Sequence, residues 1–174
     1  EIKSTDKVAI VGANGAGKTT LFQTIFNNNN SSIEINENIK IGYLSQLQGQ
    51  TLNYSNTIAD EFFDIGFKTY DDIKEYLEGY NFDEELLNQK IGTLSGGEKN
   101  LIQLAKISEV GADLLLLDEP TSHLDTYSQI ALEKAIKNYK GAILMVSHDY
   151  YTIANCMDYV LFIENKKIGK ININ

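Results

Sequence analysis

A glycine-rich run near the start of the sequence has the residue types and spacing of a phosphate-binding loop. Residues 12–19 are Gly-Ala-Asn-Gly-Ala-Gly-Lys-Thr, which matches the pattern G-x-x-x-x-G-K-[ST]. Glycines let the backbone turn its N–H groups toward phosphate oxygens, and the N-terminus of a following helix adds partial positive charge. Lys18 can reach the β- and γ-phosphates, and Thr19 offers a hydroxyl to Mg²⁺. We therefore predict a nucleoside triphosphate site formed by Gly12, Asn14, Gly15, Ala16, Gly17, Lys18, Thr19 and Thr20.

Two acidic residues follow a run of four leucines in the second half of the chain. Residues 114–117 show no alternation of apolar and polar types, which is typical of a strand buried on both faces of a parallel sheet. Asp118 and Glu119 then stand at its carboxyl end, where parallel sheets bind ligands. Asp118 is a candidate partner for Mg²⁺, and Glu119 is placed to orient or deprotonate a water. Taken alone, such an acid pair is more often a solvated strand end, so this prediction depends on Lys18 and Thr19.

His148 is a third candidate at the same edge. It follows the apolar run Ala142–Val146, which predicts another buried strand, so it is expected beside Asp118 and Glu119. A lone His is usually structural, and its assignment as a functional residue depends on these neighbours.

A second glycine pair precedes a predicted helix. Residues 94–98 are Leu-Ser-Gly-Gly-Glu, and backbone amides with a serine hydroxyl before a helix can build an anion site. Because the chain already holds a complete phosphate loop, a second anion site implies a second nucleotide. The alternative is that Ser95 is only a helix N-cap in a flexible turn.

The elements that must position these residues alternate between strands and helices. A strand is predicted at residues 7–11 before the phosphate loop, followed by a helix at residues 19–26 with apolar residues at helical spacing. Further helices are predicted through residues 101–108 and at residues 127–138. Strands alternating with helices predict an α/β fold, a P-loop NTPase with a mainly parallel core sheet.

Three further segments complete the expected architecture. Residues 32–35 and 39–44 flank Asn-Glu-Asn as a hairpin would, and residues 159–164 and 167–173 are expected to form a second hairpin. Together they are a small antiparallel β part. Helical periodicity from residue 57 onward predicts a helical subdomain at about 57–110 that carries the Leu-Ser-Gly-Gly-Glu motif.

Length and composition set the limits of these predictions. The chain has 174 residues, enough for one domain, and no apolar run long enough to span a membrane. A formal net charge of −9 disfavours direct DNA binding. The sequence begins with Glu-Ile-Lys, without an initiator Met or a signal pattern, so we expect a cytoplasmic fragment of a longer chain.

The order of these motifs strongly resembles that of the ABC ATPase cassette, from about residue 7 to residue 168. The resemblance is carried by the phosphate loop, Gln46, the motif at 94–98 and the segments 114–120, 122–125 and 146–149. It implies that ATP and Mg²⁺ are the ligands, and that a second cassette faces this one. Ser95, Gly96, Gly97 and Glu98 would contact ATP held by that partner. Gln46 would reach the Mg²⁺ and the attacking water, Asp125 would couple the two sites, and His148 would touch the γ-phosphate.

Within this family the sequence looks most like the ABC-F branch, whose members carry two cassettes and act at the ribosome, some in antibiotic resistance. Glu98 followed by Lys99, and the pair Tyr150 and Tyr151 after His148, carry this resemblance. The absence of a long basic arm between Gln46 and residue 94 is similar to the second cassette of such proteins. Two alternatives stay open: the motor subunit of a membrane transporter, with a membrane partner, and a non-catalytic module regulated by ATP.

Overall fold

The computed structural model describes residues 1–45 and 52–173, which form two compact units. The sheet unit comprises Glu1–Gln46, Gly111–Pro120 and Tyr139–Asn174. The helical unit comprises Leu47–Val110 and Thr121–Asn138. The helical unit thus includes residues 121–138 in addition to the helical range expected from the sequence.

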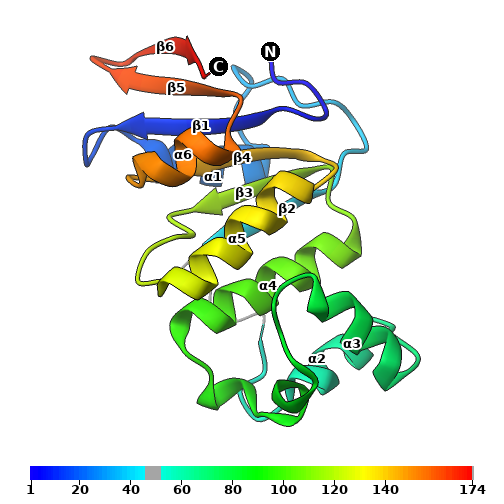
Figure 1. Ribbon diagram of the computed structural model, residues 1–174. Coiled ribbons are helices and arrows are strands. Elements are labelled where there is room, and N and C mark those ends of the chain that lie inside the picture. Colours follow the sequence, from blue (N-terminus) through cyan, green and yellow to red (C-terminus); the bar gives the residue numbers. More distant parts are fainter. Residues whose placement is uncertain (46–51, 174) are drawn as a thin grey trace. The chain divides into compact units, whose positions relative to one another are not determined.

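The sheet unit is built on six strands in the order β2-β3-β4-β1-β5-β6 (Figure 1). The first five strands are parallel, and β6 runs antiparallel to β5. A mainly parallel α/β fold is therefore confirmed. The strand bounds are β1 Lys7–Gly12, β2 Ile41–Ser45, β3 Leu114–Asp118, β4 Ala142–Val146, β5 Tyr159–Glu164 and β6 Lys167–Asn172.

The two central strands owe their position to continuous apolar sequence. In β3, full burial is seen for Leu115, Leu116 and Leu117. Every residue of β4 is buried as well. Helix α1, Lys18–Asn27, packs Phe22 and Ile25 into the same core cluster as Leu116. Burying one such side chain stabilises the fold by about 1.5–3 kcal/mol, so this cluster fixes the sheet that carries the site.

The hairpin expected from residues 32–35 and 39–44 is wrong. Residues 32–35 form no strand, and β2 pairs in parallel with β3 instead, with Tyr43 opposite Leu116. Pairing with a central strand buries Tyr43 and Leu44, which a two-stranded hairpin alone could not do. Ile33 and Ile35 pack against the core cluster from irregular backbone. The antiparallel part of the sheet is the β5–β6 hairpin, as the second hairpin prediction stated.

One short helix of the sheet unit was not anticipated. Helix α6, Tyr150–Cys156, begins at Asp149, whose carboxylate accepts hydrogen bonds from the backbone N–H groups of Tyr151 and Thr152. An Asp followed by an amphipathic stretch is a helix-start signal.

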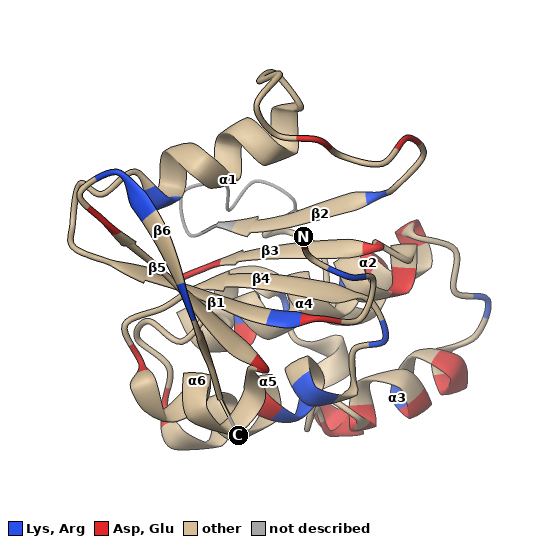
Figure 2. Ribbon diagram, turned by 90° about the horizontal axis from the view of Figure 1, so that it is seen from above, with Lys and Arg blue, Asp and Glu red and all other residues tan. Residues whose placement is uncertain are grey.

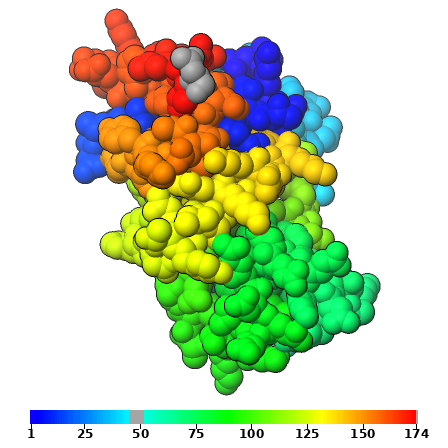
Figure 3. Space-filling model, in the orientation of Figure 1, coloured from blue at the N-terminus to red at the C-terminus, as the bar shows by residue number. Residues whose placement is uncertain are grey.

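The β6 strand lies at the edge of the sheet, and its residues are mostly exposed at the surface (red in Figure 3).

The helical unit is organised by side-chain caps. Helix α2, Ile58–Asp64, starts with a capping box of Thr57 and Asp60, and α3, Tyr70–Glu78, starts at Thr69. Its other elements are the 3₁₀ helices η2 Glu84–Asn88 and η3 Ile91–Thr93, and the helices α4 Gly96–Val110 and α5 Thr126–Asn138. Ile58, Phe62, Ile73 and Leu77 are fully buried, in line with the predicted apolar faces.

Charge is unevenly distributed over the elements. Figure 2 shows acidic residues gathered along α3 of the helical unit, and basic residues along β6 of the sheet unit. Across the part of the chain that the structure describes, every helix is too short or too polar to cross a membrane.

Candidate nucleotide site

The phosphate loop joins β1 to α1 with two glycines in the left-handed region. Gly15 has φ 81° and Gly17 has φ 93°, values that other residues adopt only with strain. Gly17 is the N-cap of α1 and makes no side-chain cap. The first N–H groups of a ten-residue helix therefore stand at the end of the loop without a capping side chain, which is the arrangement that binds phosphate.

Lys18 is held over this loop. Its side chain is folded against the backbone, and the residue is only 8% exposed. The Nζ atom donates hydrogen bonds to the carbonyl oxygens of Gly12 and of Ala13, the second at 3.3 Å. The ammonium group is thus already placed where the loop would wrap a phosphate chain.

Asp118 lies against the start of α1. Its Oδ2 atom accepts a hydrogen bond from the Thr19 hydroxyl at 3.4 Å, and the Tyr43 hydroxyl lies 3.5 Å away. The parallel register that aligns Asp118 with Val146 of β4 and Ser45 of β2 produces this placement. Gln46, predicted to act here, lies outside the described residues.

Glu119 and His148 form a pair at the ends of β3 and β4. The Glu119 N–H donates to the Val146 carbonyl at 2.8 Å, and the residue adopts a left-handed backbone with φ 49°. Its Oε1 atom lies 3.2 Å from Nε2 of His148, and its Oε2 atom accepts a 3.4 Å hydrogen bond from the His148 N–H. The Glu119 side chain is 30% exposed and that of His148 55%, so both can meet a ligand. A strained backbone of this kind is typical of functional sites.

These groups line one cavity of about 370 Å³ within the sheet unit. Its walls come from the phosphate loop, the start of α1 and the ends of β3 and β4: Asn14, Gly15, Gly17, Lys18, Thr19, Thr20, Asp118, Glu119, Val146 and His148. Residues separated by more than a hundred positions in sequence are brought together here by the parallel register, as expected for the carboxyl edge of such a sheet.

The oxygen donors of Thr19 and Asp118 suit Mg²⁺. It prefers hard oxygen ligands and keeps some water or substrate oxygens in its shell, so two protein ligands are enough. Among the described residues no group of three or more His, Cys, Asp or Glu could hold a metal ion by itself. The donor set fits a magnesium ion that is shared with nucleotide phosphates.

The second glycine motif belongs to the helical unit. The Ser95 hydroxyl accepts a hydrogen bond from the Glu98 N–H at 3.1 Å, and the Glu98 carboxylate accepts one from the Ser95 N–H at 2.9 Å. The two residues thus form a capping box at the start of α4. Ser95 is therefore the N-cap of α4, which does not decide between the two interpretations, and nucleotide contact through this residue stays a prediction.

The two glycines after Ser95 differ in their surroundings. A Cβ atom on Gly97 would lie 2.6 Å from Cδ2 of Leu124, and Ser128 is also near. A Cβ atom on Gly96 would meet nothing within 4 Å. Gly97 therefore serves the packing of α4 on the residues before α5, while Gly96 is open to an incoming group.

Asp125 acts as a local cap in this structure. Its carboxylate accepts hydrogen bonds from the Ser128 N–H at 2.7 Å and from the Ser128 hydroxyl at 3.1 Å. The backbone hydrogen bond from Ser128 is the main cause of a pKa below the usual value for this carboxyl. A coupling role for Asp125 between two sites stays a prediction.

The sequence did not single out Tyr43 at this site. On β2 it looks like a core aromatic, and its ring does pack edge-on against Phe22 at 6.0 Å between centroids. Only the register of β2 with β3 reveals that its hydroxyl lies near Asp118.

Comparison with known proteins adds to this geometry. Residues 1–122 match the family model described as ABC transporter. The chain is 36% identical over 169 residues to ABC transporter F family member 5 of Arabidopsis thaliana, covering 94% of this chain and 24% of that protein. It is 32% identical over 173 residues to the energy-dependent translational throttle protein EttA of Escherichia coli K12, covering 94% of this chain and 30% of that protein.

A solved structure shares the fold. It is a dimeric post-hydrolysis state of an ATP-binding cassette bound to ADP and Pi, with a TM-score of 0.75 and 20% identity, covering 100% of this chain and 88% of that chain. The curated relatives are much longer, since this chain spans only 24% to 30% of their length.

Proposed function

Because this chain belongs to the ABC transporter family, whose cassettes are ATPases, we propose that it binds ATP with Mg²⁺ and hydrolyses the β–γ phosphoanhydride. The observation that carries the proposal is the single cavity lined by Lys18, Thr19, Asp118, Glu119 and His148. It combines a cation for the phosphates, oxygen ligands for a metal, and a carboxylate base.

Each group has a distinct part in the reaction. The N–H groups at the start of α1 and the Lys18 ammonium bind and orient the β- and γ-phosphates. Thr19 and Asp118 would hold Mg²⁺, which would neutralise charge on the phosphates when bound. Glu119 accepts a proton from the attacking water, and His148, 3.2 Å from its carboxylate, orients that carboxylate and reaches toward the γ-phosphate.

Replacing the base tests this assignment. Glu119→Gln keeps the shape of the side chain but removes the proton acceptor, so turnover falls by about 10²- to 10⁴-fold. Affinity for Mg²⁺–ATP is unchanged, because the phosphate loop is intact. The measurement is steady-state phosphate release together with a binding titration. Activity equal to wild type would exclude Glu119 from this role.

A second cassette completes the proposed site. The sheet unit already holds one phosphate loop, and Ser95, Gly96 and Asp125 belong to the other unit. The first turn of α4, which begins at Gly96, offers backbone N–H groups to a second anion. In this proposal that anion is the nucleotide of a facing cassette. Closure around two ATP molecules is then favoured until hydrolysis removes the γ-phosphate contacts. Specific ATPase activity therefore rises with protein concentration, and an activity independent of concentration would contradict pairing between chains.

For the cellular role we propose an ABC-F protein of the ribosome. The support is similarity to two proteins named as ABC transporter F family members and to one named as an energy-dependent translational throttle. The test is to purify the full-length protein with the Glu119→Gln substitution, which holds it in the ATP-bound form, and to identify what is recovered with it. Recovery with ribosomes is expected. Recovery with a membrane-spanning partner instead would favour the transporter alternative.

A further inference from the structure

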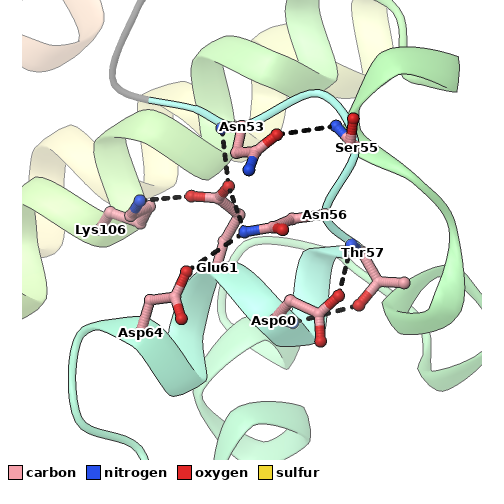
Figure 4. Close-up of polar contacts among 8 residues, drawn as sticks. All are labelled: Asn53, Ser55, Asn56, Thr57, Asp60, Glu61, Asp64 and Lys106. Carbon is pink, nitrogen blue, oxygen red and sulfur yellow. Dashed lines mark hydrogen bonds and ion pairs between the residues drawn. The ribbon is translucent and has the colours of Figure 1, made fainter.

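A buried carboxylate in the helical unit has no part in the chemistry above. Glu61, on α2, is only 2% exposed. Its Oε1 atom accepts hydrogen bonds from the Asn53 N–H at 2.8 Å and from Asn56 Nδ2 at 3.2 Å. Its Oε2 atom pairs with Nζ of Lys106 on α4, whose side chain is 15% exposed. Figure 4 shows Glu61 at the centre of these partners.

A buried ion pair of this kind is poor evidence for stability. Removing two charges from water costs about as much as their attraction returns, and apolar residues of similar volume often serve stability equally well. What the carboxylate adds is direction, because its two oxygens accept from donors on fixed sides. Glu61 thereby ties two segments to α2. One is helix α4, and the other is residues 53–57, which we call the strap.

The strap leads directly to the second glycine motif. The Ile91 N–H donates to the Asn56 carbonyl at 2.8 Å, and the Gly92 N–H donates to the Tyr54 carbonyl at 3.1 Å. The Lys99 ammonium lies 4.7 Å from the centre of the Tyr54 ring. The strap therefore contacts both the turn before Ser95 and the first turns of α4.

We propose that Glu61 is a positioning residue for the Ser95–Gly96 turn. Through Lys106 it fixes the rotation of α4 about its axis, and through the strap it fixes the backbone at Ile91 and Gly92. The turn lies between these two attachments, so its N–H groups are held in one place before a nucleotide arrives. This role rests on the proposed function, in which that turn contacts the ATP of a facing cassette.

The test compares three variants. E61L/K106M removes both attachments with an apolar pair, which is compatible with folding. E61Q is nearly isosteric but leaves one acceptor oxygen where the carboxylate has two. The matched control is D64N, because Asp64 also accepts from Asn56 Nδ2 at 3.2 Å but is exposed.

Amide hydrogen exchange at Ile91 and Gly92 reports on the strap without any nucleotide. In E61L/K106M these two amides exchange about tenfold faster than in wild type, the scale of one lost hydrogen bond to a charged group. The exchange rates in E61Q lie between those of wild type and those of E61L/K106M, and the rates in D64N match wild type. If E61L/K106M does not fold, E61Q alone decides. Unchanged exchange in a folded variant, or equal exchange in D64N and E61Q, overturns the proposal.

Kinetics of the full-length protein provide the second measurement. In E61L/K106M kcat falls about tenfold, while KM for ATP, set by the intact phosphate loop, changes less than about threefold. A loss that follows the folded fraction would point to a structural role only and contradict positioning. A wild type without ATP turnover would instead contradict the proposed function, and the exchange rates would still decide the role of Glu61.

Discussion

The sheet unit and the helical unit hold their motif residues in opposite ways. In the sheet unit, Lys18, Asp118 and Glu119 come from distant segments and line one cavity. In the helical unit, Ser95 and Asp125 bond to residues three positions away as helix caps. The first set is arranged by strand register and the second by local hydrogen bonds. The chain thus gathers the motif residues of the sheet unit around one cavity, whereas those of the helical unit are held only by local caps.

Glycines illustrate the same difference. Gly17 is needed for a backbone with φ 93° that opens the phosphate loop. At Gly97 the constraint is packing, since a Cβ atom there would lie 2.6 Å from Cδ2 of Leu124 and that side chain would have to shift. The same residue type is thus required by backbone conformation in one unit and favoured by the closeness of a neighbouring side chain in the other.

Exchanging one histidine in each unit gives the largest expected contrast. His148→Ala removes the partner 3.2 Å from the Glu119 carboxylate, and turnover falls by about 10- to 100-fold, as for a lost hydrogen bond to a charged group. The control is His123→Asn, since His123 has φ 62° and Asn tolerates that backbone. Turnover of the control stays near wild type. Equal losses in the two variants would mean that the sheet unit has no special place in catalysis.

The adjacent glycines of the helical unit sharpen the comparison. Gly97→Ala places a methyl group 2.6 Å from Cδ2 of Leu124, the end of a flexible side chain that can shift, and lowers the free energy of unfolding by about 1 kcal/mol, the low end for overpacking. Gly96→Ala meets nothing within 4 Å at the first residue of α4, and the free energy of unfolding changes by less than about 0.5 kcal/mol. Urea unfolding of the three proteins measures both values. Loss of ATP turnover in the stable Gly96→Ala protein would support nucleotide contact at Gly96, whereas equal stability of the two variants would refute the packing role of Gly97.

The smallest effect concerns the charge of Asp125. The folded-state pKa of this carboxyl is lowered from 3.8, chiefly by the Ser128 N–H, so its charge favours the folded state. This stabilisation is fully present above about pH 5, starts to fall near the unfolded pKa of 3.8 and is lost as pH falls through the lowered folded pKa. Asp125→Asn removes it. The difference between the unfolding free energies of the two proteins is therefore expected to shrink toward the acid end of a series of unfolding curves, and a constant difference would contradict the assignment.

The sequence predicted the sheet better than the helical unit, because apolar runs and the residues at their ends are enough to locate the buried strands. Residues 114–117 and Ala142–Val146 specified β3 and β4, and with them the edge that carries Asp118, Glu119 and His148. The strand β2 was assigned the wrong partner, since residues 32–44 alone cannot show that β3 offers a better surface than a local hairpin.

The role of Glu61 could not be predicted in the same way. Glu61 stands 45 positions before Lys106, and its place in an acidic helix start suggests a solvated side chain. Only the packed structure shows that it is buried and which donors face it. The closeness of Leu124 to Gly97 could not be predicted either, because it is a tertiary contact, and nucleotide contact through Gly97 stays a prediction.

The central claim is that the cavity of the sheet unit binds the phosphates of Mg²⁺–ATP, and titration calorimetry tests it most directly. Lys18→Met keeps the buried stem and removes the ammonium that now contacts the Gly12 and Ala13 carbonyls. Wild type is expected to bind one ATP per chain, and Lys18→Met to bind about 100-fold more weakly, as for lost charge-assisted hydrogen bonds. No heat from wild type, or equal affinity in the two proteins, would contradict the claim.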